Sequence, residues 1–198
     1  MIGKIDCFLP CSNPSDQKET IKMLRRSKTI RQINLLVDSD FKVAERADDC
    51  TTIVVDNLLS TDTMRKVSEN AEADYVLLAL KSTPLVLGQH ALDRLLRVAT
   101  DTHAALVYSD YHAVVDGKRE QHPVIDYQMG SLRDDFDFGS LLFIRADLLH
   151  EYAATCGKEG GHQFDFAGLY DLRLFLSRKG ELFHINEYLY TAQESDTR

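Results

Sequence analysis

Carboxylates and aromatic rings alternate in one short segment of this chain, Arg133-Asp134-Asp135-Phe136-Asp137-Phe138-Gly139. A carboxylate can take a proton from a hydroxyl group as a general base, and aromatic rings can form a platform for the face of a sugar. Asp134 and Asp135 are therefore candidate catalytic residues. In the alternative interpretation, Arg133 pairs with one of the aspartates and the two phenylalanines belong to the core.

Polar groups also follow the first two predicted strands. The segment Pro10-Cys11-Ser12-Asn13 follows the first strand, and Asp38 follows the second. Open α/β sheets bind ligands beyond the carboxyl ends of their strands. The backbone of this segment and the Ser12 hydroxyl can hold a nucleoside, while Asp38 can accept hydrogen bonds from its base or ribose. The alternative is an ordinary turn and a solvated loop.

Two further places bear on metal binding. A buried run over residues 75–80 leads into Lys81 and Ser82, where an ammonium group would repel a cation and a hydroxyl is a weak ligand. Lys81 is either a fixed positive charge that stands in for a metal ion or a loop lysine without a catalytic role. Asp110 and His112 have a spacing that a metal ion can use, but they can equally be ordinary polar residues.

Short apolar runs alternate with helical patterns through the first half, which predicts βα units on a mainly parallel sheet. The Asp116-Gly117 pair predicts a tight hairpin turn, so the second half is α+β in character. The predicted strands are Lys4–Leu9, Ile33–Val37, Thr52–Val55, Tyr75–Leu80, Ala104–Tyr108, Tyr111–Val115, Gly139–Arg145, Leu182–Ile185 and Tyr188–Tyr190. The first predicted helix follows Asp16, and further helices are predicted over Asp62–Asn70, Gly88–Thr100, Asp147–Ala154 and Leu169–Lys179. Within Gly88–Thr100, apolar residues recur at three- and four-residue spacing and predict one apolar face over the sheet: Ala91, Leu92, Leu95, Leu96 and Ala99.

Several of these segments resemble family 2 glycosyltransferases of GT-A fold. The opening strand with its Pro-x-x-Asn loop, the second strand ending in Asp38, and the buried strand over residues 73–80 are similar to that family's. The resemblance implies a GT-A-like α/β fold with a mainly parallel, Rossmann-like sheet flanked by helices. It implies one domain over residues 1–198, with a nucleotide-binding half of about 1–100 and an acceptor half of about 101–198.

The chain departs from this family at both motifs that carry its chemistry. Leu80-Lys81-Ser82 replaces the Asp-x-Asp motif whose carboxylates hold Mg²⁺ or Mn²⁺, so no cofactor is firmly expected. Gly168-Leu169 replaces the Glu-Asp pair that supplies the base, and only Asp171 and Leu172 of that motif remain. The base is therefore expected from Asp134, Asp135 or Asp171. Arg65 lies where the family often has a basic residue near the donor diphosphate.

The resemblance implies inverting transfer of a sugar from a nucleotide-diphosphate sugar to a polysaccharide or lipid-linked acceptor. The alternative is a non-catalytic relative that binds a nucleotide-sugar or a partner enzyme. A nucleotidyltransferase shares the βα layout, but the chain lacks a Gly-rich, Arg- or Lys-bearing signature after its first strand.

Composition narrows the range of partners and locations. The 198 residues carry a formal charge of −8 without a basic run, which argues against nucleic-acid binding. The four cysteines include no Cys-x-x-Cys pair and predict reduced thiols. No apolar run approaches the ~18 residues of a membrane span. A soluble cytoplasmic protein is expected, with peripheral membrane association possible because related enzymes act on lipid-linked acceptors.

Overall fold

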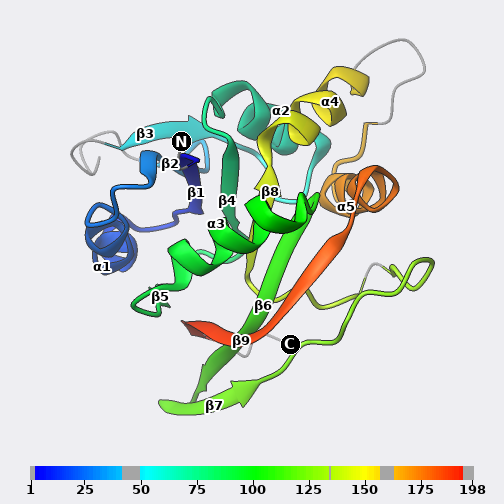
Figure 1. Cartoon of the computed structure of the whole chain (residues 1–198). Coiled ribbons are helices and arrows are strands. Elements are labelled where there is room, and N and C mark those ends of the chain that lie inside the picture. The colour runs from blue at the N-terminus through cyan, green and yellow to red at the C-terminus, as the bar shows by residue number, and fades with distance from the viewer. Residues whose placement is uncertain (1–2, 42–49, 134, 157–162, 194–198) are drawn as a thin grey trace.

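A computed structural model describes residues 3–41, 50–133, 135–156 and 163–193. These residues form five helices and a mixed sheet of nine strands (Figure 1). The strands are β1 Ile5–Pro10, β2 Ile30–Val37, β3 Thr51–Val54, β4 Tyr75–Ala79, β5 Leu85–Leu87, β6 Leu106–Val115, β7 Lys118–His122, β8 Leu141–Arg145 and β9 Leu182–Gln193. The helices are α1 Pro14–Leu24, α2 Thr61–Asn70, α3 Ala91–Thr102, α4 Ala146–Thr155 and α5 Gly168–Lys179.

The sheet order is β3-β2-β1-β4-β8-β6-β9-β5, with β7 paired to β6. The first half of the chain supplies the parallel strands β3, β2, β1 and β4. In the second half, β8 runs antiparallel to both β4 and β6, while β6 and β9 are parallel. The predicted fold class is confirmed, with the parallel pairs concentrated in the first half as the alternating pattern indicated.

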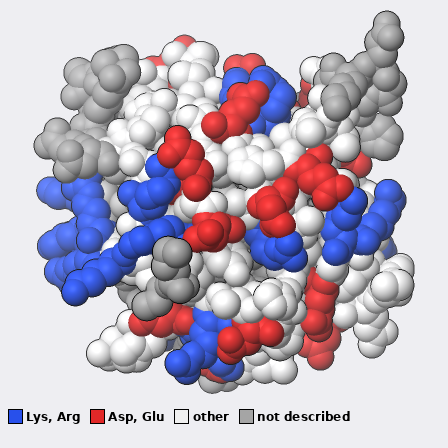
Figure 2. Space-filling model, turned by 45° about the horizontal axis from the view of Figure 1, so that its top comes forward, with Lys and Arg blue, Asp and Glu red and all other residues white. Residues whose placement is uncertain are grey.

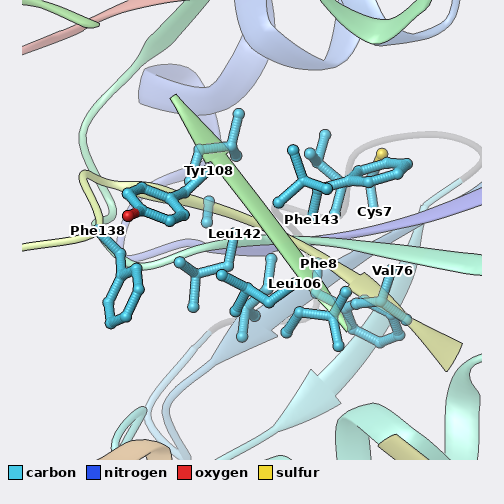
Figure 3. Packing of buried hydrophobic residues seen from close by; sticks show 14 of the residues in the cluster. Cys7, Phe8, Val76, Leu106, Tyr108, Phe138, Leu142 and Phe143 are labelled. Atoms are coloured by element: carbon cyan, nitrogen blue, oxygen red, sulfur yellow. The ribbon is translucent and has the colours of Figure 1, made fainter. Parts of the chain in front are cut away.

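Helices flank this sheet because each has one apolar face. Figure 1 shows α3 lying across one face, and its buried residues Ala91, Leu95, Leu96 and Ala99 belong to the predicted apolar stripe. The helices α2, α4 and α5 contact one another as a group. Between them lies a core whose rings and aliphatic side chains come from neighbouring strands, among them Phe8, Val76, Leu106 and Leu142 (Figure 3).

Three sequence predictions of strands are corrected by the structure. The two strands predicted over residues 104–115 are one long strand, β6, and those over residues 182–190 are likewise one, β9. The short strand β5 was not predicted at all. The register between these two strands shifts between Ser109 and Tyr111 on β6, opposite Ile185 and Tyr190 on β9, and such an irregularity interrupts the local alternation that marks a strand in sequence. The Asp116-Gly117 turn is as predicted, with φ of 50° and 75°.

Figure 2 shows acidic and basic side chains interspersed on one face, with Lys and Arg gathered at its left margin. Across the described ranges, no helix combines the length and the apolar character that crossing a membrane requires.

A buried ion pair joins three segments at the amino edge of the parallel strands. The Asp6 carboxylate on β1 has no exposed surface. Its oxygens accept hydrogen bonds from Arg31 Nε and Nη2 at 2.8 and 2.7 Å, and from the backbone N–H groups of Glu72 and Ala73 at 2.7 and 2.9 Å. Since four donors surround it, the buried charge is compensated.

We expect Arg31→Ala to lower the free energy of unfolding by about 3 kcal/mol, because it leaves the buried Asp6 charge without its cation. Chemical denaturation with urea measures this loss. Arg94→Ala is the matched control, since Arg94 pairs with Glu187 at 2.7 Å and both side chains are more than 40% exposed; it should cost at most about 1 kcal/mol. Equal losses for the two variants would contradict the special role of the Asp6 site.

Candidate functional site

The loop after β1 is fixed on both sides. The Cys11 N–H donates to Leu36 O at 2.8 Å, so the loop begins by extending the pairing of β1 with β2. Asn13 is the N-cap of α1, and its Oδ1 accepts hydrogen bonds from Ser15 N at 3.1 Å and Ser15 Oγ at 2.9 Å. The Asn13 side chain therefore holds the helix, while the exposed Ser12 keeps its hydroxyl available to a ligand.

Gln17 joins this loop to the segment that replaces the metal motif, a connection that sequence reasoning missed. Its Nε2 donates to Pro10 O at 3.0 Å and to Ser82 O at 2.9 Å. One turn further along α1, Thr20 Oγ1 donates to Leu85 O and accepts from Leu85 N, both at 3.1 Å. Because both acceptor segments lie 65 residues away, nothing local in the sequence signals either contact.

The segment after β4 is held from the other side by β8. Leu80 N–H donates to Ser140 O at 2.9 Å, while Lys81 and Ser82 are half-buried. A lysine ammonium and a hydroxyl do not fit a divalent cation. In the part of the chain that the structure describes, no group of three or more His, Cys, Asp or Glu side chains could hold a metal ion.

Asp38 lies at the end of β2, at the same edge of the sheet as Pro10. Its side chain is exposed, and Oδ1 accepts a hydrogen bond from Asp40 N at 3.1 Å. The carboxylate is thus oriented by its own loop and still accessible to a ligand. Parallel strands β1 and β2 end together, so Asp38 and the Pro10–Asn13 loop share one edge as predicted.

Arg65 lies on the outer side of α2. It forms ion pairs with Asp62 at 2.6 Å and with Glu69, one turn to either side. The hydrogen bonds that Arg65 donates to Asp62 and then to Glu69 raise the pKa of Arg65 above its usual value. A helix-surface network accounts for this arginine, and its place near a donor diphosphate stays a prediction.

The aspartates of the acidic segment 133–139 have different partners. Asp134 lies outside the described residues. Asp135 forms an exposed ion pair with Arg133 Nε at 3.2 Å. Asp137 Oδ2 lies 2.9 Å from His122 Nε2, and its Oδ1 accepts from Gly139 N at 2.7 Å.

The predicted sugar platform of Phe136 and Phe138 is wrong. Their exposed fractions are 8% and 1%, and the two rings pack against each other at 4.5 Å. Phe138 also contacts Tyr108 edge to face, at 4.8 Å between ring centroids (Figure 3). Burial of large rings stabilises the core, so the alternative interpretation of this segment holds for both residues.

A buried arginine covers the Phe138 ring from α5. The Arg173 guanidinium carbon lies 5.0 Å from the ring centroid, and its Nε has no hydrogen-bond partner among the described residues. Burial lowers the pKa of Arg173 to about 10, and the charge of Asp137 opposes that shift. Arg173 thus contributes positive potential beside Asp137.

Asp171 lies in the first turn of α5 and accepts a hydrogen bond from Tyr152 Oη at 3.0 Å. Burial first, and then the charges of Cys156 and Asp171, raise the pKa of Tyr152 above its usual value. Gly168, at the start of the same helix, lies against α2. A Cβ there would meet Thr61 N at 2.1 Å. Residue 168, where the family has the Glu of its Glu-Asp pair, therefore has no room for a side chain.

Asp110 and His112 do not form the joint site that their spacing suggested. Asp110 Oδ1 lies 2.9 Å from His184 Nε2 and accepts from Val124 N at 2.8 Å. His112 Nδ1 instead lies 2.9 Å from Arg119. Burial, and then the charge of Arg119, lower the pKa of His112. No local pattern pointed to His184, which is 74 residues from Asp110.

A cavity of about 700 Å³ opens along the segment between β7 and β8. Among its lining residues are three carboxylates, Asp126, Asp135 and Asp137, together with Arg133. Asp137 is three residues before Ser140, whose carbonyl binds Leu80. The chain that lines the cavity therefore continues, within three residues, into the segment that binds the end of β4.

The solved structures similar to this chain share its fold. Residues 1–349 of S. aureus TarS match with a TM-score of 0.65, 11% identity and coverage of 96% of this chain and 60% of that chain. The same protein in complex with UDP matches at 0.63, with 11% identity and coverage of 97% and 61%. The chain thus spans about 60% of the length of these TarS structures.

A second kind of enzyme shares the same arrangement. The 4-diphosphocytidyl-2C-methyl-D-erythritol synthase of Anaerococcus prevotii DSM 20548 matches with a TM-score of 0.59, 10% identity and coverage of 93% of this chain and 88% of that chain. No protein-family model matches the sequence, and neither does any curated protein. TarS is a GT-A glycosyltransferase and the synthase a nucleotidyltransferase with a related fold, so this chain has a GT-A-like, Rossmann-like fold.

We expect Gln17→Leu to lower the free energy of unfolding by about 1–3 kcal/mol, because two carbonyl groups lose their donor. Urea denaturation measures the loss, and amide hydrogen exchange of residues 80–85 should accelerate. Lys18→Leu, at an exposed position on the same helix, is the control and should change stability by at most about 0.5 kcal/mol. Unchanged exchange in Gln17→Leu would show that another contact holds this segment.

Proposed function

We propose that this chain binds a nucleotide-diphosphate sugar at the carboxyl edge of β1, β2 and β4 and transfers the sugar to a glycan or lipid-linked acceptor. The observation that carries the proposal is the shared edge of the Pro10–Asn13 loop and Asp38 in a GT-A-like fold. A similar structure, TarS, binds UDP. The acceptor half would supply the cavity along residues 123–137.

In this proposal, the nucleoside lies against the Pro10–Asn13 backbone and the Ser12 hydroxyl, with Asp38 accepting hydrogen bonds from base or ribose. The Cys11 side chain is buried, so its contribution is that of the backbone. Lys81 would supply positive charge near the diphosphate in place of a metal ion, with Ser82 beside it and Arg65 further out on α2.

The non-catalytic alternative keeps the same donor site without transfer. Replacement of both family motifs favours this alternative. Lys81 cannot hold a metal ion as the family's carboxylates do, and Gly168 has no side chain that could act as a base. Nucleotidyl transfer is favoured by the fold shared with the synthase, but the loop Cys11-Ser12-Asn13 carries none of the basic residues that would bind a triphosphate. A cytoplasmic location, with peripheral contact to a membrane, belongs to the proposal as well.

We expect Asp38→Ala to weaken the binding of UDP- or GDP-sugars by about 1.5–3 kcal/mol, through loss of a charge-assisted hydrogen bond. Isothermal titration calorimetry gives the dissociation constants. Asp40→Ala, in the same exposed loop, is the matched control and should bind as the wild type does. Unchanged affinity in Asp38→Ala would remove this residue from the donor site.

We expect nucleotide-sugar affinity to be the same within about threefold in Mn²⁺ and in chelator, because Lys81 and Ser82 cannot hold a divalent ion. The measurement is a pair of calorimetric titrations of one donor, with Mg²⁺ as a third condition. An affinity at least tenfold higher with Mn²⁺ would contradict this and would require carboxylates elsewhere in the site.

A further inference from the structure

A histidine on β9 lies between two carboxylates, one of which, Asp126, lines the cavity along residues 123–137. His184 Nε2 is 2.9 Å from Asp110 Oδ1, and His184 Nδ1 is 2.6 Å from Asp126 Oδ1. The His184 side chain is 5% exposed and that of Asp110 is 9% exposed, whereas that of Asp126 is 72% exposed. The trio therefore leads from the buried strand β6 to a carboxylate at the surface.

The two inner members are positioned by the sheet itself. Tyr108 and His184 are register partners on the parallel strands β6 and β9, and their rings stack at 4.9 Å with an interplanar angle of 10°. A stacked imidazole cannot rotate without losing this contact. Its two nitrogens consequently keep their directions, one toward β6 and one toward the cavity.

The backbone on both sides of Asp126 is held by Tyr108. The Tyr108 hydroxyl donates to Ile125 O at 2.9 Å and accepts from Tyr127 N at 2.8 Å. Figure 3 shows the same ring packed beside Phe138, with its hydroxyl oxygen at the end. Burial, and then the charges of Asp126 and Asp110, raise the pKa of Tyr108 to about 12. The Tyr108 hydroxyl therefore keeps its proton, and its hydrogen bond to Ile125 O, at neutral pH.

The exposed carboxylate keeps one oxygen for a ligand. Asp126 Oδ1 is bound to His184, and no donor from the described part of the chain binds Oδ2. Because the stacked His184 ring holds Oδ1, the orientation of the Asp126 carboxylate at the cavity is fixed and Oδ2 stays open to a ligand.

We propose that Asp126 is the catalytic base for the acceptor hydroxyl and that His184 and Asp110 are positioning residues. This rests on the sugar transfer proposed above. Asp126 Oδ2 takes the proton of a sugar hydroxyl, whose oxygen forms the new bond to the anomeric carbon of the donor. The bond from that carbon to the diphosphate oxygen breaks, and its electron pair leaves with the nucleoside diphosphate.

The two candidate bases from the sequence that the structure describes, Asp135 and Asp171, lack this combination of features. Asp135 lines the same cavity, but its described partner is the exposed Arg133. Asp171 receives a hydrogen bond from Tyr152, and the residues given for the cavity do not include it. Asp126 alone among these three combines an exposed oxygen, a cavity and a buried partner that sets its orientation.

The test is steady-state release of nucleoside diphosphate by the full chain from a panel of UDP- and GDP-sugars, with short oligosaccharides as acceptors. Asp126→Asn should lower kcat by about 10²–10⁴-fold while donor affinity by calorimetry stays within twofold. His184→Gln should lower kcat with little change in KM, and Asp126→Glu should recover part of the loss. The matched control is Asp93→Asn, because exposed Asp93 on α3 also faces a histidine, His90, at 3.9 Å.

Three outcomes would overturn the assignment. If Asp126→Asn turns over as fast as Asp93→Asn and only melts at a lower temperature, the trio is a structural ion-pair network. If Asp135→Asn or Asp171→Asn loses turnover while Asp126→Asn keeps it, the base is elsewhere, although the transfer reaction stands. If the wild type binds and consumes none of the donors, the proposed function itself fails and the base assignment with it.

Discussion

The parallel half of the sheet depends on a charge that water does not reach. The Asp6 carboxylate lies inside β1, where every residue of the strand is buried, and it ties β2 through Arg31 to the turn before β4. A buried carboxylate is costly unless its oxygens are fully hydrogen-bonded. Its four donors come from segments 25 to 67 residues away, so the charge is tolerated only when three segments are in their native positions.

The two edges of the sheet therefore differ in the contacts that hold them. At the amino edge, the strands are held by the ion pairs of Arg31 with Asp6 and Glu72. At the carboxyl edge, hydrogen bonds from Gln17 and Thr20 hold backbone segments in place while Ser12 and Asp38 stay exposed. A rigid base with accessible loops is the usual basis for binding in α/β folds.

Local sequence patterns predicted much of the fold. The spacing of Leu92, Leu95, Leu96 and Ala99 predicted α3, and Asp116-Gly117 predicted the turn between β6 and β7, because helix faces and tight turns are determined by neighbours in sequence. The short strand β5 could not be found this way. Its three residues are fixed by pairing with β9, about 100 residues later, and by Thr20 on α1.

The candidate site was predicted less completely, because several of its contacts also join residues that are distant in sequence. Asp38 and the Pro10–Asn13 loop were found because strand ends meet at one edge, whereas Phe136 and Phe138 were assigned to a ligand when they belong to the core. Gln17 and His184 were missed because each acts on partners distant in sequence. Side-chain chemistry identifies candidates, but only tertiary contacts decide which of them face a ligand.

The close approach of Gly168 to Thr61 has a consequence for protein engineering. Restoring the acidic motif of the resembled enzymes by substitution at residue 168 would drive a side chain into the backbone at the start of α2. The two helices would have to separate, and α4, which packs on both, would move with them. An acidic residue at position 168 is therefore not accessible by point mutation. A redesign of this region would have to begin with the distance between α2 and α5.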